Sequence, residues 1–219
     1  MAVIEGGVSG ALQGVGAESA SAAHVQLKPI AHGALGHYRT AVRIASTTAQ
    51  AANSRIFEIR NTHATNLIIP TILSIRALQT AAGTAQENSL DVYKVTGFSA
   101  VDTVNTVTPV SSVKRGNMAA YPGGAAIRYL TLTGAAAGMT GGTLTKDTQF
   151  FATLPYNVSA AISTSTVWAQ ENVLNDIQGT HPFVLTQNEG IIIENRVLNA
   201  TSYGITWYID FSWAEVTAY

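Results

Sequence analysis

Apolar and polar residues alternate along the closing segment GITWYIDFSWAEVTAY, residues 204–219. Successive side chains of a β-strand point to opposite faces of a sheet, so a period of two places every second residue on the same face. One row is bulky and apolar, and it contains Ile205, Trp207, Ile209, Phe211 and Trp213. The other row contains Thr206, Tyr208, Asp210 and Ser212. The segment therefore predicts a strand inside a sheet, with the apolar row in a core.

The same kind of pattern recurs through most of the chain after Tyr38. We predict further strands at 38–45, 54–61, 66–78, 89–98, 125–134, 148–154, 182–186 and 190–198, with the closing strand at 204–214. The segment 163–171 is ambiguous, and the Thr/Val-rich segment 99–116 fits either a weak strand or a long loop. Turn-forming residues separate these segments at intervals that are typical of β-sandwiches and barrels.

Two neighbouring segments predict more detail. We expect 54–61 and 66–78 to form a pair, because the turn-prone sequence THAT lies between them. Pro70 has no backbone N–H to donate to a ladder, so it predicts either an edge position or a bulge in the second strand. The alternation in that strand predicts one shared face for Leu67, Ile69, Leu73, Ile75 and Ala77.

The fold class that these patterns favour is all-β, with two packed antiparallel sheets in a jelly-roll-like sandwich. We assign the sandwich domain to residues 39–219. Residues 1–38 are rich in Ala, Gly and Ser and have no clear period, which predicts an extended N-terminal arm. A short helix within 9–24 is compatible with the alanines there, although the glycines count against it.

One segment of the chain echoes another. FEIRNTHATNLIIPTILSIRA and IIIENRVLNATSYGITWYIDFSW share an order of strand, Asn, a turn with Ala-Thr, and a long strand. Two interpretations stay open: two related hairpins, one in each half of the chain, or chance among strands of similar composition. We favour chance.

The composition adds that much of the surface is uncharged. Hydrophobic residues make up 47% of the 219 residues, which is enough for a core, whereas charged residues make up only 11%. An average soluble protein has roughly 25% charged residues, and charge keeps a free monomer soluble. Two compatible explanations follow: a Thr/Ser-rich β surface, or a surface that is covered by other protein chains.

Charge and sequence motifs exclude several kinds of partner. The net charge is −1, and no basic run extends beyond Lys114-Arg115, so we expect no nucleic-acid binding. There are no cysteines, which excludes disulfides and thiolate metal sites. We expect no membrane span, because no apolar run reaches about 18 residues. The N-terminus lacks the basic and apolar regions of a secretory signal.

No combination of residues predicts catalysis, a cofactor or a metal site. The histidines His24, His32 and His37 lie in the Ala/Gly-rich arm, which offers no rigid scaffold for zinc, and His63 and His181 stand apart from them. Glu189 and Glu194 are five residues apart, so a regular strand points them to opposite faces and they form no acid/base pair. We therefore expect a protein that is not an enzyme.

Two further groups of residues have a structural explanation. Glu194 and Arg196 are spaced for an exposed ion pair on one face of a strand. Trp168, Trp207 and Trp213 are candidates for stacking on sugars, but the last two belong to the apolar row and are expected in the core.

The C-terminus resembles the closing motif of tailed-bacteriophage virion structural proteins. The resemblance is carried by PFVLTQNEGIIIENRVL and YGITWYIDFSWAEV, that is, by a Pro-x-x-Leu strand, a Glu-Gly turn, an Ile-x-Asn strand and a final Trp-rich strand that ends in Trp-x-Glu. The stretch SSVKRGNM resembles a Lys-Arg-Ser stretch of such proteins, and an Ala/Gly/Ser arm before a sandwich fits the same class.

The resemblance implies a capsid decoration, or cement, protein of a phage. Such a protein is expected to bind the major capsid protein, or other virion proteins, as a homotrimer at local three-fold positions. It acts by multivalent contact rather than by chemistry. Its location is then the virion, assembled in the cytoplasm of the bacterial host. The alternatives are a tail, neck or baseplate component, and a carbohydrate-binding sandwich for host attachment.

The small number of charges predicts attachment that is mostly apolar and hydrogen-bonded, through Thr/Ala-rich loops and the arm. Two other modes of attachment would involve particular residues. Attachment by charge would involve Lys114, Arg115 and Arg128, and bridging by calcium would involve Asp91, Asp102, Asp147 and Asp176.

Overall fold

The computed structural model describes residues 3–6, 11–14, 35–109, 113–114, 123–131, 136–162, 166–175, 183–199 and 204–217. It describes the side chains of all these residues except 3–6, 11–14, 114 and 166–175. The described residues form strands and the turns between them, and they contain no helix.

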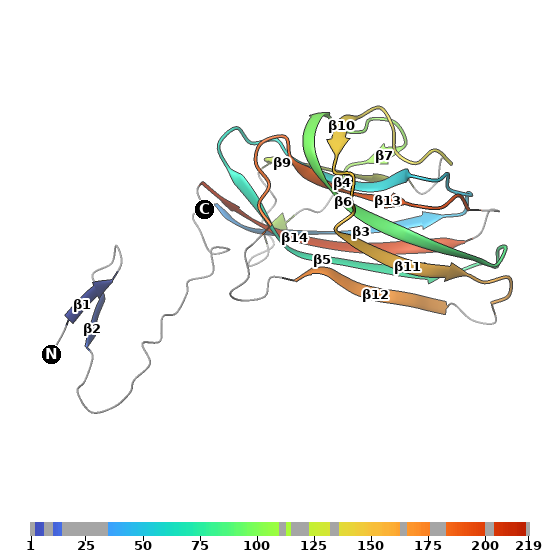
Figure 1. The fold of residues 1–219 in the computed structure, drawn as a ribbon, viewed down its shortest axis with the longest axis horizontal. Helices are drawn as coiled ribbons and strands as arrows, with labels where there is room; N and C mark the ends of the chain where they lie inside the picture. The colour runs from blue at the N-terminus through green and yellow to red at the C-terminus, as the bar shows by residue number, and fades with distance from the viewer. Residues whose placement is uncertain are drawn as a thin grey trace.

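Two antiparallel sheets lie face to face (Figure 1). The five-stranded sheet has the order β12 (Thr166–Asn175), β5 (Leu67–Gln79), β14 (Ile205–Val216), β3 (Gly36–Ser46) and β8 (Val113–Lys114). The seven-stranded sheet has the order β10 (Thr143–Lys146), β6 (Gln86–Ala100), β13 (Gly190–Asn195), β4 (Ser54–Asn61), β9 (Ala125–Leu130) and β7 (Thr106–Val107). Its seventh strand, β11 (Ala152–Val158), also pairs with β6. The predicted all-β sandwich is confirmed, and the jelly-roll variant of it stays a prediction.

The closing strand lies in the middle of its sheet, as its apolar row predicts. β14 pairs with β5 on one side and with β3 on the other. Its apolar row is buried: Ile205, Trp207, Ile209, Phe211 and Trp213 are each at most 1% exposed. The prediction of a core-facing row on this strand is therefore confirmed.

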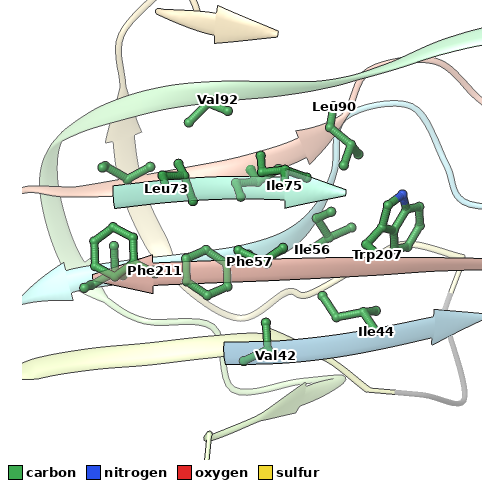
Figure 2. Packing of buried hydrophobic residues seen from close by; sticks show 14 of the residues in the cluster. Val42, Ile44, Ile56, Phe57, Leu73, Ile75, Leu90, Val92, Trp207 and Phe211 are labelled. Atoms are coloured by element: carbon green, nitrogen blue, oxygen red, sulfur yellow. The ribbon is translucent and has the colours of Figure 1, made fainter. Parts of the chain in front are cut away.

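The core fills the space between the two sheets (Figure 2). Phe211 of β14 meets Phe57 of β4 across this space, with ring centroids 6.2 Å apart. Phe211 also stacks on Trp213, whose ring contacts Tyr38 of β3. Aromatic contacts of this kind stabilise a core beyond the area they bury, by about 0.5–1.5 kcal/mol each.

β13 is buried on both of its faces. Ile191 and Ile193 belong to the main core, whereas Ile192 points the other way. There it packs with Val95 and Phe98 of β6 in a second, smaller apolar cluster. The run of three isoleucines is thus explained by two apolar layers, one on each side of this central strand.

A bulge in β5 overturns the predicted face of its first residues. Ser212 of β14 pairs with Ile72 and Trp213 pairs with Pro70, so Thr71 has no partner across the ladder. The extra residue reverses the alternation, because the side-chain period of a strand is two. Ile68 therefore joins the core, while Leu67 and Ile69 join a separate cluster with Ala214 and Val216. Within the described residues both explanations of Pro70 apply, because it flanks the bulge and its ladder is with β14 alone, since the pairing with β12 ends at Ile72.

The expected pairing of 54–61 with 66–78 is wrong, although both strands exist at nearly these bounds. β4 lies in the seven-stranded sheet and β5 in the five-stranded one, so the segment between them crosses from one sheet to the other. β13 and β14 make the same crossing. The echoed segments are therefore crossings between sheets and not hairpins.

The strands of the two crossings are neighbours in both sheets and run antiparallel, so the two connecting segments lie at opposite ends of the sandwich. β4 pairs antiparallel with β13 in one sheet, and β5 pairs antiparallel with β14 in the other. Asn61 and Asn195 end the first strand of each crossing, and both are fully buried. Each amide donates to backbone carbonyls, Asn61 to Asn66 and Leu185 and Asn195 to Ala51 and Val197. The echoed segments thus have similar places in the fold, because each crosses between the sheets after a buried Asn.

Short edge strands account for most other differences from the predictions. The predicted strand at 148–154 is displaced to β11, and β10 lies in a segment for which no strand was predicted. Both pair with the same edge of β6, and residues 147–151 interrupt the edge between them. Within its described residues, the segment 99–116 contains the end of β6 and the two-residue strands β7 and β8, and the predicted strand 125–134 is found as β9, which ends at Leu130. The ambiguous segment 163–171 overlaps β12.

The predicted strand at 182–186 is wrong where it is described. Leu185 forms a single bridge with Ile68, and the described residues around it are not in a strand. In the N-terminal region, β1 (Val3–Gly6) and β2 (Ala11–Gly14) pair with each other as a separate sheet. Residues 7–10 and 15–34 of the predicted arm lie outside the described residues.

Candidate functional site

A fully buried pair of carboxyl groups lies on the outer face of the seven-stranded sheet. Glu58 belongs to β4, where its neighbours Phe57 and Ile59 point into the core. Asp102 follows β6, and both side chains are 0% exposed. The backbone N–H of Asp102 donates to Glu58 Oε1 at 2.7 Å, so the loop after β6 is fixed directly over the glutamate.

Asp102 connects this loop to two other segments. Arg55 donates from Nη2 to Asp102 Oδ1 at 2.6 Å, and the N–H of Gly142 donates to the same oxygen at 2.8 Å. Gly142 must be small, because a Cβ there would lie 2.8 Å from the Asp102 side chain. The carboxyl pair therefore fastens the segment around 142 to the sheet beneath it.

The pair holds a proton near neutral pH. Burial and the nearby charge of Asp102 together raise the pKa of Glu58 from 4.5 to about 7, although the Asp102 N–H and the charge of Arg55 lower it. Glu58 Oε2 and Asp102 Oδ2 are both buried and have no other hydrogen-bond partner. A proton on Glu58 that is donated to Asp102 provides the missing partner for both oxygens.

Shared protons are also found in catalytic carboxyl pairs, but this pair lacks access to a substrate. Catalysis requires an acid or base within hydrogen-bond reach of the reacting group. Here both carboxyl groups are covered, and their hydrogen bonds are to other groups of the protein. The arrangement therefore fits a structural role, in which the proton removes a repulsion between two buried charges.

A second polar cluster lies on the same outer face. Asp91 and Glu194 are opposite each other on β6 and β13 and are almost fully buried. Glu194 forms an ion pair with Lys146, and Asp91 lies 3.8 Å from Arg196 Nε. The predicted pair of Glu194 with Arg196 is therefore wrong, because each of these residues is paired with a residue of another segment.

Glu189 lies in the turn before β13, and its contacts differ from those of Glu194. Lys94 Nζ is 2.9 Å from Glu189 Oε1, and the Thr186 N–H donates to Oε2 at 2.8 Å. Burial alone would raise the pKa of Glu189, but these contacts outweigh it and lower the pKa. The two glutamates hold separate ion pairs, in agreement with the prediction that they form no acid/base pair.

Two of the five histidines lie within the described residues. His37 Nε2 lies 2.8 Å from Thr71 Oγ1, and His63 Nε2 lies 3.4 Å from Glu215 Oε2. Trp213 Nε1 donates to the other oxygen of Glu215 at 3.3 Å. His24, His32 and His181 lie outside the described residues.

The described residues provide no metal site, and the calcium candidates do not come together within them. Asp91 and Asp102 belong to the two separate clusters above, and the backbone of Asp147 is fixed by a bond to Lys94. No group of three or more His, Cys, Asp or Glu residues suited to a metal occurs in the described part. Asp176 is not among the described residues.

Two tryptophans are unavailable as sugar platforms. Trp207 and Trp213 are both 0% exposed. Trp168 lies in β12, of which the side chains are not described. The described ranges also contain no helix with the length and apolarity that a membrane crossing requires.

The outer face of the five-stranded sheet carries two arginines and a tyrosine in one row. Arg43 of β3 and Arg76 of β5 are the ladder partners of Tyr208 on β14. Their guanidinium carbons lie 5.9 Å and 4.5 Å from the centroid of the Tyr208 ring. Among the candidates for attachment by charge, Arg128 donates to the carbonyl of Ile127, and the side chains of Lys114 and Arg115 are not described.

The sequence analysis did not single out Glu58 or the two arginines. Glu58 lies in the pattern SRIFEIRN, where the polar row looks solvent-exposed unless the segments that cover it are known. Arg43, Tyr208 and Arg76 each stand at an outward position of a predicted strand, but the register that aligns them depends on which strands pair. The alternation predicts that these three side chains point outward, but no sequence pattern predicts which strands pair.

Comparisons with known proteins identify no relative. No protein-family model matches the chain, and no curated protein or solved structure matches it.

Proposed function

We propose that this chain is a structural protein of a tailed-bacteriophage particle, and that it is a capsid decoration protein that binds and stabilises the major capsid lattice. In this proposal the protein is not an enzyme and acts as a homotrimer, and its partners are the major capsid protein or other virion proteins. Each contact is weak, and the repeated contacts add up over the lattice.

The observation that carries the proposal is the closing segment, which resembles virion structural proteins. In the fold, this segment supplies the central strand β13 of one sheet and the central strand β14 of the other. Its Glu-Gly turn places Gly190 where a Cβ would lie 2.0 Å from the carbonyl oxygen of Ile59. The motif thus consists of residues on which the packing of both sheets depends, as expected of a motif whose role is structural.

The use of charge supports a role in assembly. In all five ion pairs of the described residues, the carboxylate is the more buried partner. The carboxylates of these pairs hold the fold together and contribute little to the outer surface. The loop between β13 and β14 instead exposes Val197 and Leu198, which are 38% and 58% exposed. Such a surface supports attachment through apolar contacts.

The alternatives differ in how well the fold supports them. A tail, neck or baseplate component would use the same sandwich, and only the position in the particle distinguishes it from a decoration protein. A carbohydrate-binding protein needs exposed aromatic rings, and Trp207 and Trp213 are buried.

The test is to add the purified protein to capsids of the encoding phage that were assembled without it. We expect the protein to sediment with the capsids in a fixed ratio and to raise the temperature at which they break open. A protein that stays in the supernatant, or that sediments only with tails, would overturn the assignment to the capsid.

A further inference from the structure

The row formed by Arg43, Tyr208 and Arg76, which we call the Arg–Tyr row, projects from the outer face of the five-stranded sheet. Arg43 is exposed, and Tyr208 and Arg76 are half-buried. The neighbouring rows consist mainly of shorter side chains, with Ala45, Thr206 and Leu78 on one side and Ala41, Asp210 and Ser74 on the other. Among the described side chains of β3, β5 and β14, the charges of this outer face are these two guanidinium groups, Arg39 and Asp210.

Neither arginine has a carboxylate partner among the side chains that the structure describes, which do not include those of β12 beside Arg76. Within the described residues, every ion pair lies outside the Arg–Tyr row. Asp210 is exposed in the next row, but it lies beyond ion-pair distance of Arg43 and Arg76. The contrast with the seven-stranded sheet is clear, because there Arg55, Lys146 and Arg196 each have an acidic partner.

The ring of Tyr208 holds the two guanidinium groups in position for a ligand. A guanidinium over an aromatic face keeps its N–H groups available, and these N–H groups match the two oxygens of a carboxylate. Adjacent strands are about 4.8 Å apart, so the two arginines stand roughly 10 Å apart at their Cα atoms on either side of the ring. Two acidic residues of one extended segment, spaced about 7 Å apart at positions i and i+2, fall within reach of both.

Other ligands fit this face less well. Nucleic acid requires a wider basic stripe, whereas the whole chain has 12 Lys and Arg residues against 13 Asp and Glu residues, and Asp210 lies beside the row. A sugar ring would need the face of Tyr208, which Arg76 already approaches to 4.5 Å. An acidic protein segment is the ligand that uses both arginines without displacing them.

We propose that the outer face of the five-stranded sheet is a docking surface for an acidic segment of a partner protein, with its carboxylates bound by Arg43 and Arg76 across Tyr208. This proposal is independent of the assignment to a phage particle. It adds a charged contact to an attachment that the composition alone predicts to be mostly apolar.

The probe for this surface is a fluorescein-labelled hexaglutamate peptide, whose binding is followed by fluorescence anisotropy at about 50 mM NaCl. The test variant is Arg43→Gln with Arg76→Gln. The matched control is Arg128→Gln, because Arg128 is a half-buried arginine on the other sheet. We expect the double variant to bind at least about tenfold more weakly and the control to bind within about twofold of the wild type. Raising NaCl to about 500 mM should weaken the wild type and abolish the difference.

Competition separates the other ligand classes. We expect unlabelled hexaglutamate to displace the probe at a lower concentration than a sulfated oligosaccharide or a single-stranded oligonucleotide of equal charge. Stronger displacement by either of these, failure of hexaglutamate to bind, or unchanged binding by the double variant overturns the proposal. Circular dichroism shows whether the double variant folds. If it does not fold, Arg43→Gln alone, at an exposed position, should weaken binding by about threefold or more, and unchanged binding overturns the proposal.

Discussion

Glu58 is fully buried beside Asp102, so loss of its proton places a second negative charge in the packed interior. Its carboxyl group faces Asp102, which in turn forms an ion pair with Arg55. Arg128 on β9 is the ladder partner of Glu58. The pKa of Glu58 is about 7 in the folded chain and 4.5 without the fold, so the folded state binds the proton more tightly. The stability that this proton contributes is fully present below pH 4.5 and is lost as the pH rises through 7.

Glu58→Gln should therefore remove a pH dependence of stability. A Gln side chain can still accept from the Asp102 N–H, and its amide can donate to Asp102 Oδ2 without a titrating proton. We expect thermal melts of the wild type to show a loss of up to about 3 kcal/mol between pH 5 and 8, whereas E58Q should be nearly flat and more stable at pH 8. A wild-type profile that is flat in this range would contradict the shared proton.

Glu189→Gln is the matched control, because the pKa of Glu189 is lowered. A lowered pKa stabilises the fold above the unfolded value, and this contribution is lost only as the pH falls through the folded value. E189Q should thus lower stability at neutral pH and keep the slope between pH 5 and 8.

Trp207 tests the burial of the apolar row. Its ring is 0% exposed, and its Nε1 has no hydrogen-bond partner among the described residues. Trp207→Ala should lower the free energy of unfolding by about 3–5 kcal/mol, as measured by denaturant titration. Trp207→Phe should cost clearly less, since it leaves a smaller cavity and breaks no hydrogen bond. A loss below about 1 kcal/mol for the alanine variant would place this ring on the surface.

At the scale of elements, the contact between β13 and β4 depends on Gly190. A Cβ at this position would lie 2.0 Å from the Ile59 carbonyl oxygen and 2.5 Å from the ring of Phe98. Gly190→Ala should therefore cost about 1–3 kcal/mol, because the strand must move away from its neighbour. Gly97→Ala in β6 is the control, since nothing lies within 4 Å of its Cβ. Equal melting temperatures for the two variants would show that β13 does not pack this closely.

Alternation predicts strands well where one face of the strand is buried and the other is not. β3, β4, β5 and β14 were found in this way to within a few residues. It fails where backbone hydrogen bonding to a neighbour, rather than side-chain burial, creates the strand, as in β7, β8 and β10. It also fails at Thr71, because a bulge reverses the faces without any local signal apart from Pro70.

The sequence pattern does not predict which strands pair when they are far apart along the chain. The THAT turn suggested a hairpin, yet it crosses between sheets, because β4 finds its partner in β13 more than a hundred residues away. The polar clusters depend on the same long-range pairings. Arg43 and Arg76 meet only because β14 lies between β3 and β5, and Glu58 is buried only because the loops around 102 and 142 cover it.

At the scale of the whole molecule, we expect removal of the predicted N-terminal arm to weaken oligomerisation or binding to the particle while the sandwich stays folded. β3 starts at Gly36, and Tyr38 packs on Trp213, so a truncation has to end before Leu35 to leave the sheet intact. We expect the chain without residues 1–34 to keep its β-sheet circular dichroism and to sediment as a monomer, whereas the full chain sediments as a trimer. A truncated chain that still sediments as a trimer would show that the sandwich alone makes the contact.

The most direct test of the central claim, that the chain belongs to a phage particle, is a cryo-electron microscopy map of the intact particle proposed to contain it. The account predicts density for the two-layered sandwich on the outer face of the capsid, with three copies around each occupied local three-fold position. Density for the sandwich in the tail, neck or baseplate, or a particle that lacks it altogether, would contradict the account.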